Sequence, residues 1–114
     1  MKTLDILTAE EERAAAVFRA LGNPARVRIV TELARRNACV TGDFVGTLPL
    51  AQSTVSQHIK VLREAGIVRV ATMPNGDPCY CLEPGALQWV MDFCAQVCGP
   101  DCSVIGVDEL KRNC

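Results

Sequence analysis

Glycine and proline residues divide this 114-residue chain into short segments. Because proline cannot continue a helix and glycine tolerates the turn that ends one, such residues mark element boundaries. The boundaries fall at Gly22-Asn23-Pro24, Pro49, Gly66 and Gly99-Pro100. The chain is therefore built from short elements rather than from one long helix or a large sheet.

The first two segments repeat apolar residues at helical spacing, which predicts a pair of helices. The first helix covers residues 10–21 and has acidic side chains in its first turn, where they favour the helix dipole. Gly22 closes this helix. Asn23 can then cap a second helix, with Pro24 in its first position, that runs to residue 36.

Two more helices are expected before Gly66. Thr41 can cap a short third helix that contains Phe44 and Val45. The fourth helix, residues 52–65, combines an apolar stripe with many polar side chains and stops at Gly66.

The last third of the chain predicts a hairpin and a final helix. Residues 67–71 and 79–82 are extended runs, and the Asn75-Gly76 pair between them favours a tight turn because both residues accept positive φ. Residues 85–98 carry apolar side chains over so much of a helical surface that we expect this helix to pack in an interface.

This order of elements describes a winged helix-turn-helix, a mainly α fold with a β-hairpin wing. We expect a single DNA-binding domain over residues 1–114, with a short cysteine-containing C-terminal tail. A chain of this length has a modest core, so a homodimer would bury more apolar surface. No apolar run approaches the ~20 residues that cross a bilayer. Residues 1–12 lack the pattern of a secretory signal, so we expect a cytoplasmic protein with no membrane partner.

The formal net charge of -1 argues against a strongly basic protein that binds nucleic acid without specificity. DNA binding must then rest on a local surface, and the predicted helix over residues 52–65 offers one. A helix that enters the major groove needs polar side chains for base edges and positive groups for phosphates. This helix supplies both, and its DNA-binding candidates are Gln52, Ser53, Thr54, Ser56, Gln57, His58, Lys60 and Arg63. The alternative is that these residues form a solvated helix face.

Seven cysteines in a chain without an export signal favour metal ligands or redox sensors over a disulfide scaffold. Three of them, Cys94, Cys98 and Cys102, recur every four residues at the end of the last predicted helix. Residues four apart share a helix face, and Gly99-Pro100 ends the helix so that the third thiol can fold back. Three converging thiols suit a soft, thiophilic ion, whereas zinc normally needs a fourth ligand. Plain packing of small hydrophobic side chains is the alternative.

Residues 50–68 read LAQSTVSQHIKVLREAGIV, and residues 18–29 read FRALGNPARVRI. The first stretch resembles the recognition helix and following strand of the ArsR/SmtB family of metal-responsive bacterial repressors, and the second resembles the junction of that family's first two helices. The similarity extends over residues 12–98. It implies a homodimer paired through the first and last helices, which binds palindromic double-stranded operator DNA and is released when an inducer binds.

The chain departs from the family pattern in three places. Ala51 stands where the family usually has a serine that can cap the recognition helix. The wing tip, residues 73–78, contains no Lys or Arg. Arsenic sensors of the best-known type carry Cys-Val-Cys-x-x-Cys near the third helix, and only Cys39 of that motif is present here. That arsenic site therefore cannot be assembled.

Other inducer sites of the family are absent too. Zinc-sensing relatives use histidines and carboxylates on the last helix, but His58 is the only histidine, and the fourth helix has no cysteine for a cadmium or lead site. The resemblance therefore favours Cys94, Cys98 and Cys102 as a relocated site for trivalent arsenic or antimony, which would act as inducer rather than as catalytic cofactor. The choice among arsenite, a methylated trivalent arsenical and antimonite stays open, as do the number of bound thiols, the operator sequence and the regulated genes.

Two other functions remain open. The repressor could instead respond to oxidants or reactive sulfur through a disulfide between Cys94 and either Cys98 or Cys102. A winged helix can also be an interaction module without an inducer. The sequence contains no recognisable catalytic arrangement and no phosphate-binding glycine loop, so we expect neither an enzyme nor an organic small-molecule substrate.

The remaining four cysteines have weaker claims to a ligand role. We expect Cys39 to be a packed residue, although it could supply a fourth thiol. Cys79 and Cys81 alternate in a predicted strand and face the same side, where a metal or a disulfide is conceivable, but we favour strand packing. Cys114 lies at the end of the chain and is expected to take no part.

Overall fold

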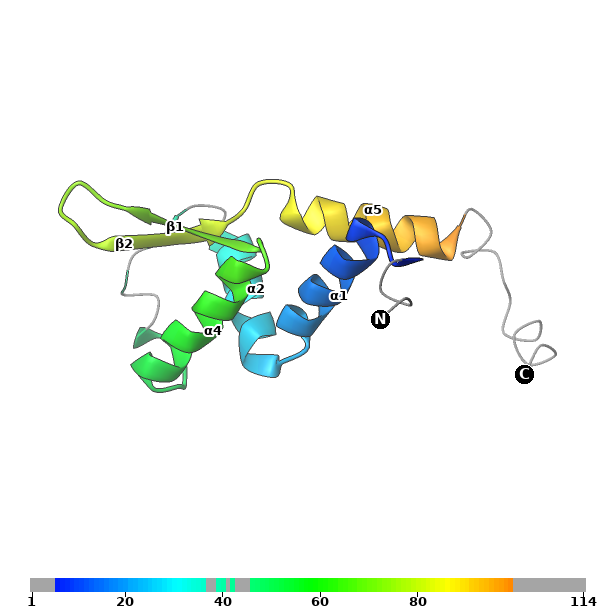
Figure 1. Ribbon diagram of the computed structural model, residues 1–114. Coiled ribbons are helices and arrows are strands. Elements are labelled where there is room, and N and C mark those ends of the chain that lie inside the picture. Colours follow the sequence, from blue (N-terminus) through cyan, green and yellow to red (C-terminus); the bar gives the residue numbers. More distant parts are fainter. Residues whose placement is uncertain (1–5, 37–38, 41, 43–45, 100–114) are drawn as a thin grey trace.

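A computed structural model describes residues 6–36, 39–40, 42 and 46–99 of the chain (Figure 1). The elements are α1 (Ala9–Leu21), α2 (Pro24–Arg36), α4 (Gln52–Glu64), β1 (Val68–Thr72), β2 (Pro78–Leu82) and α5 (Ala86–Cys98). Their type and order are as predicted, and each boundary lies within one residue of its predicted place. The short third helix predicted from Thr41 falls outside the described residues.

Side chains cap the first two helices. The Thr8 hydroxyl accepts a hydrogen bond from the Glu11 backbone N–H at 3.0 Å, and the Glu11 carboxylate accepts one from the Thr8 N–H at 3.0 Å. This reciprocal capping box starts α1 one residue earlier than predicted. The predicted cap on α2 is confirmed, because Asn23 Oδ1 accepts from the Ala25 N–H at 2.9 Å.

The hairpin pairs β1 with β2 in antiparallel register, with Val70 opposite Tyr80. Its turn differs from the expected two-residue Asn-Gly loop. The Gly76 N–H donates to the Met73 carbonyl at 2.8 Å, so Pro74 and Asn75 are the central residues of the turn. Gly76 follows at φ 91°. Proline presets the φ that the first central position of a turn needs, which explains the shift of one residue.

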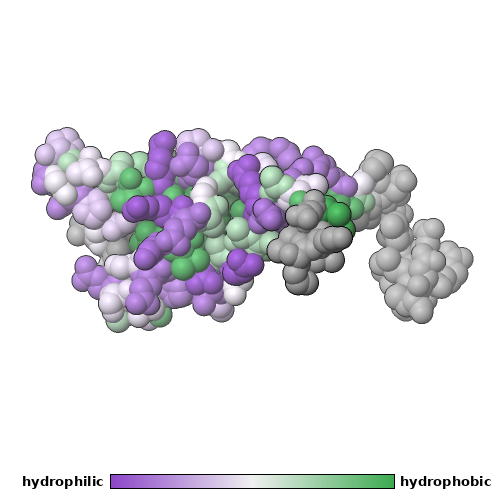
Figure 2. All heavy atoms as spheres, viewed as in Figure 1, coloured by the Kyte–Doolittle hydropathy of each residue, from purple (hydrophilic) through white to green (hydrophobic). Residues whose placement is uncertain are grey.

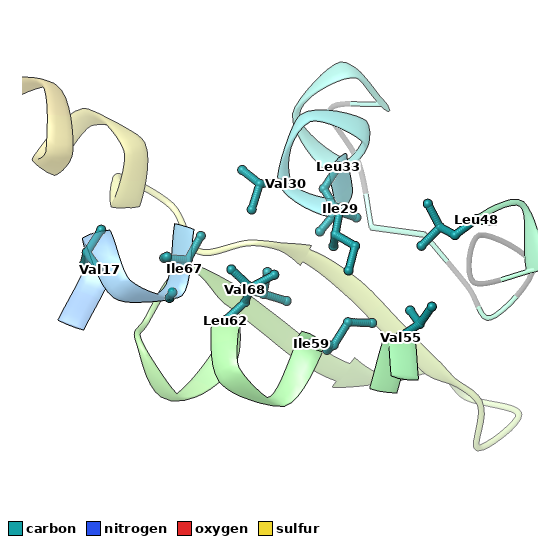
Figure 3. Close-up of a cluster of buried hydrophobic side chains, with 11 residues drawn as sticks. Val17, Ile29, Val30, Leu33, Leu48, Val55, Ile59, Leu62, Ile67 and Val68 are labelled. Carbon is teal, nitrogen blue, oxygen red and sulfur yellow. The ribbon is translucent and has the colours of Figure 1, made fainter. Parts of the chain in front are cut away.

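One hydrophobic core joins the helices to the base of the hairpin (Figure 3). Its largest fully buried side chains come from α2, α4, β1 and the residue before β1, and they are Ile29, Val55, Leu62, Ile67 and Val68. In Figure 3 the α4 side chains point up toward the hairpin and α2. Burying each such side chain contributes about 1.5–3 kcal/mol, so this core fixes how α4 is oriented.

α5 extends from the hairpin and packs beside α1 (Figure 1). The contact is aromatic: Phe93 lies edge-on to Phe18 with ring centroids 6.0 Å apart and stacks on Trp89 at 5.6 Å. The Arg13 guanidinium lies 4.2 Å from the centre of the Trp89 ring. Leu87 and Val90 pack against the core, whereas Met91 and Val97 are 64% and 73% exposed. None of the described helices is both long and apolar enough to span a membrane.

α4 starts without a side-chain cap, which generates a stability prediction. Ala51 has the extended backbone of an N-cap residue, with φ -62° and ψ 144°, but offers no oxygen to the first-turn N–H groups. Ala51→Ser should raise the free energy of unfolding by about 1 kcal/mol, because a serine hydroxyl at this position accepts one of those N–H groups. Chemical denaturation at fixed protein concentration measures the change.

Ala15→Ser is the matched control, since Ala15 is an exposed residue inside α1. Serine in a helix interior should lower stability by a few tenths of a kcal/mol to about 0.7 kcal/mol. A drop in stability at both positions would contradict the capping argument.

Candidate nucleic-acid interface

α4 is anchored by its inner face and exposes its outer face. Val55, Ile59 and Leu62 are no more than 5% exposed, at the i, i+4 and i+7 spacing of a single helix face. A hundred-degree turn per residue places Ser53, Gln57 and Lys60 opposite them, and all three are exposed. Three of the predicted DNA-binding residues therefore form one outward row, which we call the polar row.

A second set of predicted residues lies between α4 and the wing. Ser56, Lys60 and Arg63 border a cavity of about 320 Å³ whose far side is formed by Val70 and Tyr80 of the hairpin. The two positive side chains are exposed, so they add charge to the flank of α4 that faces the wing. In Figure 2 the region of α4, at lower left, is largely purple to pale, as expected for a solvated or nucleic-acid-binding surface.

His58 lies on the other flank of α4 and is tied to the body of the protein. Its Nδ1 is 3.2 Å from Nη1 of Arg26, and the His58 side chain is half-buried. The Arg26 guanidinium also donates to the backbone carbonyls of Arg19 and Ala20 at the end of α1. Arg26 thus connects α1, α2 and α4. The sequence did not indicate this role, because Arg26 and His58 are 32 residues apart in the chain.

The N-terminal turn of α4 supplies the remaining candidates. Gln52 and Ser53 are exposed and Thr54 is half-buried. The backbone N–H groups of this turn receive no side-chain cap from Ala51, so they are available to an external acceptor such as a phosphate oxygen. All eight predicted residues therefore lie on α4, but only part of the set forms the polar row.

The base of the wing carries Arg69 on β1. The Cys81 side chain, opposite Arg69 in the hairpin register, and the nearby Glu83 carboxylate raise the pKa of the guanidinium. The wing tip from Met73 to Pro78 offers amide and carboxylate groups and no cation. Asn75 is held there by its hydrogen bonds to Asp77, at 3.0 and 3.1 Å.

The predicted thiolate site is described only in part. Cys94 is a free, exposed thiol on α5, and Cys98, one turn later, is exposed and disulfide-bonded. Gly99, at φ 74°, ends the helix as predicted. Cys102 lies outside the described residues. Among the residues that are described, no group of three or more cysteine, histidine or carboxylate side chains is close enough to hold a metal ion.

The other cysteines occupy different environments. Cys79 is 5% exposed, so its expected packing role is confirmed. The expectation for Cys39 is wrong, because this residue is exposed. Cys81 is half-buried, and its thiol donates a hydrogen bond to the Arg69 backbone carbonyl at 3.9 Å. Cys114 lies outside the described residues.

Comparison with known proteins agrees with this architecture. Residues 23–70 match the family model described as "Bacterial regulatory protein, arsR family". The HTH-type transcriptional repressor SmtB of Mycobacterium tuberculosis is 40% identical over 57 residues, which are 50% of this chain and 42% of that repressor. The biofilm growth-associated repressor of Agrobacterium fabrum is 42% identical over 74 residues, 59% of this chain and 62% of the relative.

An uncharacterized HTH-type transcriptional regulator of Methanocaldococcus jannaschii is 36% identical over 58 residues, 51% of this chain and 65% of its own length. The matches thus span less than two thirds of each of these three relatives.

Solved structures share the whole arrangement of helices and hairpin. An ArsR-like transcriptional regulator from a Rhodococcus species superposes with a TM-score of 0.71 at 22% identity, over 79% of this chain and 83% of that one. HlyU from Vibrio cholerae superposes with a TM-score of 0.63 at 22% identity, over 80% and 97% of the two chains. Residues 23–70 thus match the arsR family of bacterial regulatory proteins, a family of regulators rather than enzymes, and the chain has the winged helix-turn-helix fold of the ArsR-like structures.

Proposed function

We propose that this protein is a transcriptional repressor that binds operator DNA as a homodimer and leaves it when trivalent arsenic or antimony binds the thiolates of Cys94, Cys98 and Cys102. The observation that carries the DNA-binding part is the polar row of α4, Ser53, Gln57 and Lys60, on a helix whose opposite face is buried. A rigid helix with this face can enter the major groove and read base edges.

Contacts to the DNA backbone would come from the flanks of α4. Lys60 and Arg63 are exposed beside the wing and can neutralise phosphates. The uncapped N–H groups after Ala51 can donate to a further phosphate oxygen. His58 contributes by fixing the orientation of α4 through Arg26. Its direct contact with DNA is therefore smaller than its position on the recognition helix suggests.

The homodimer is supported by apolar surface on α1 and α5 that the single chain leaves exposed. Phe18 is 45%, Met91 64% and Val97 73% exposed. In Figure 2 a small green area lies toward the α5 end of the molecule, at right, apart from the larger one at its centre. Contiguous apolar surface of this kind marks interaction sites. A second copy pairing through the same helices would cover it and place two α4 helices for a palindromic operator.

The inducer part rests on thiol chemistry at the end of α5. Cys94 and Cys98 are four residues apart and exposed, so they occupy the same helix face. Gly99 turns the chain away at the end of the helix, which allows the next cysteine in sequence, Cys102, to supply a third sulfur. Trivalent arsenic and antimony take three thiolates, whereas structural zinc takes four ligands. Each bound thiol loses its proton, which leaves as water with a hydroxyl group of the trivalent arsenic or antimony.

α5 also offers a route from the thiols to the DNA-binding helix. Phe93 lies one residue before Cys94 and packs on Phe18 of α1, and α1 in turn contacts α4. Pulling the end of α5 into a three-sulfur site would reshape this contact and the dimer spacing that depends on it. A coupling of about 1–3 kcal/mol per site releases an operator appreciably.

A second candidate function is repression controlled by thiol oxidation. One specific observation favours it: Cys98 is disulfide-bonded, while Cys94 is free. An oxidant or reactive sulfur species acting on these cysteines would change the same end of α5 without a metalloid. An inducer-free interaction module is the third possibility, and it predicts that thiol-reactive ligands leave DNA binding unchanged.

The polar row predicts two different effects on DNA binding. Lys60→Ala should weaken binding about equally for operator and unrelated duplexes, and should lower the slope of log affinity against log salt by about one. Gln57→Ala should cost about 1–3 kcal/mol on operator DNA and much less on unrelated DNA, because the amide reads a base edge. Fluorescence anisotropy over a salt series, with the promoter upstream of the protein's own gene, measures both effects.

Arg35→Ala is the charge-matched control, since Arg35 is exposed on α2 and pairs with Glu32 on the same helix. It should leave the salt slope and the operator affinity nearly unchanged. If Arg35→Ala and Lys60→Ala lower affinity equally, the binding surface is not α4.

The thiolate site predicts a defined mass change. The fully reduced protein titrated with arsenite should take up one arsenic per protomer with loss of three protons, seen by native mass spectrometry. Replacement of Cys94, Cys98 or Cys102 by serine should abolish tight uptake, and Cys79→Ser, at a buried position, should not.

Zinc titrated in parallel should bind more weakly, for want of a fourth ligand. No arsenic uptake at micromolar concentration would exclude the metalloid sensor and leave thiol oxidation as the working explanation.

A further inference from the structure

A second pair of thiols meets at the base of the wing, outside the site proposed above. Val40 forms an antiparallel bridge with Tyr80 on the free edge of β2. The Val40 N–H donates to the Tyr80 carbonyl at 2.8 Å, and the Tyr80 N–H donates to the Val40 carbonyl at 2.7 Å. Two such bonds make Val40 and Tyr80 a hydrogen-bonded pair. Hydrogen-bonded and non-hydrogen-bonded pairs alternate along antiparallel strands, so the neighbouring residues Cys39 and Cys81 oppose each other as a non-hydrogen-bonded pair.

Opposed residues in a non-hydrogen-bonded pair have Cα atoms about 4.5 Å apart and side chains on the same face of the sheet. Cys39 and Cys81 both line the same cavity, which agrees with this placement. Arg69 lies opposite Cys81 on its other side, in the β1–β2 register. The face therefore carries a row of three side chains, Arg69, Cys81 and Cys39, with two sulfurs adjacent.

The thiol pair borders a cavity with a volume of about 530 Å³. Leu33 of α2, Leu82 of β2 and Leu87 of α5 give this cavity an apolar lining next to the sulfurs. Arg69 and Glu83 stand at its edge. A ligand held by both sulfurs would thus have room for an apolar group beside it.

We propose that Cys39 and Cys81 form a dithiol site for a monosubstituted trivalent organoarsenical, whose organic group occupies the cavity lined by Leu33, Leu82 and Leu87. This site does not depend on the function proposed above, which uses the cysteines of α5 and the tail.

The reaction balances without an oxidant. The two S–H groups of Cys39 and Cys81 react with the two As–OH groups of the ligand, two As–S bonds replace two As–O bonds, and two waters leave. Arsenic stays trivalent, and its third bond, to carbon, is unchanged. Inorganic arsenite lacks that carbon and would need a third sulfur, which this pair does not supply. A dithiol and an adjoining apolar cavity therefore select a substituted arsenical over the inorganic ion.

The surroundings of Cys81 favour the protonated form of its thiol. The adjacent Cys39 side chain and then partial burial raise the pKa of the Cys81 thiol, against an opposing effect of Arg69. The water-releasing exchange suits this state, because the S–H proton of Cys81 leaves in the water that forms. Bidentate capture distinguishes this pair from the exposed Cys94.

Phenylarsine oxide is the probe that tests the site. The full chain carrying Cys94→Ser, Cys98→Ser and Cys102→Ser, fully reduced, should retain one phenylarsenic group with loss of two hydrogens, measured by native mass spectrometry in excess monothiol. Adding Cys39→Ser or Cys81→Ser should weaken retention at least about 100-fold, because the second As–S bond forms intramolecularly. Adding Cys79→Ser instead should leave the adduct unchanged, since Cys79 is buried on the same strand.

Peptide mapping of the unsubstituted chain gives an independent readout. Phenylarsine oxide should protect Cys39 and Cys81 from later alkylation, and arsenite should not. Retention that survives both Cys39→Ser and Cys81→Ser, or absence of protection at these two residues, overturns the proposal. Failure of arsenite to bind Cys94, Cys98 and Cys102 would count against the proposed inducer and leave the phenylarsine oxide result untouched.

Discussion

The burial of one face of α4 is the constraint on which the rest of the structure depends. Val55, Ile59 and Leu62 are held between α2 and the base of the hairpin, so α4 cannot rotate about its axis without exposing all three. That packing, and not the polar residues themselves, decides which side chains reach solvent. The Arg26 bridge to His58 adds a polar tie between α4 and the end of α1. A recognition surface on α4 is thus preorganised before DNA arrives.

α5 is held much more loosely than α4. Of the described α5 residues only Ala86, at its first turn, is fully buried. Leu87, Trp89 and Val90 are half-buried against the core, and Phe93 packs on Phe18 of α1. An element with little buried area can be displaced by a modest free energy. Thiols at the far end of such a helix suit a sensor, because a ligand that binds there can move the helix end without disrupting the packing of the main core.

Local signals predicted most of the fold, and contacts between distant residues account for what was missed. Helix boundaries follow from caps such as Asn23 and stops such as Gly99, which act within a few residues. The wing turn was misjudged because Pro74 competes with the Asn-Gly pair for its centre. The pairing of Cys39 with Cys81 depends on the Val40–Tyr80 bridge, which no periodicity in either segment indicates. The polar face of α4 was predictable, and the role of His58 was not.

The position of the Cys39–Cys81 pair gives it a mechanical consequence that the α5 thiols lack. Cys39 follows α2, and Cys81 lies on β2, so a shared arsenic atom would link the helical core covalently to the wing. The two backbone hydrogen bonds between Val40 and Tyr80 already join these segments, in addition to the packing of α2 and α4 against the base of the hairpin. Closing the loop between the two cysteines also removes chain entropy from the unfolded state, as a disulfide does. Ligand at this site would therefore stabilise the core and fix the wing relative to α4, whereas ligand at the end of α5 would disturb the dimer contact that we propose.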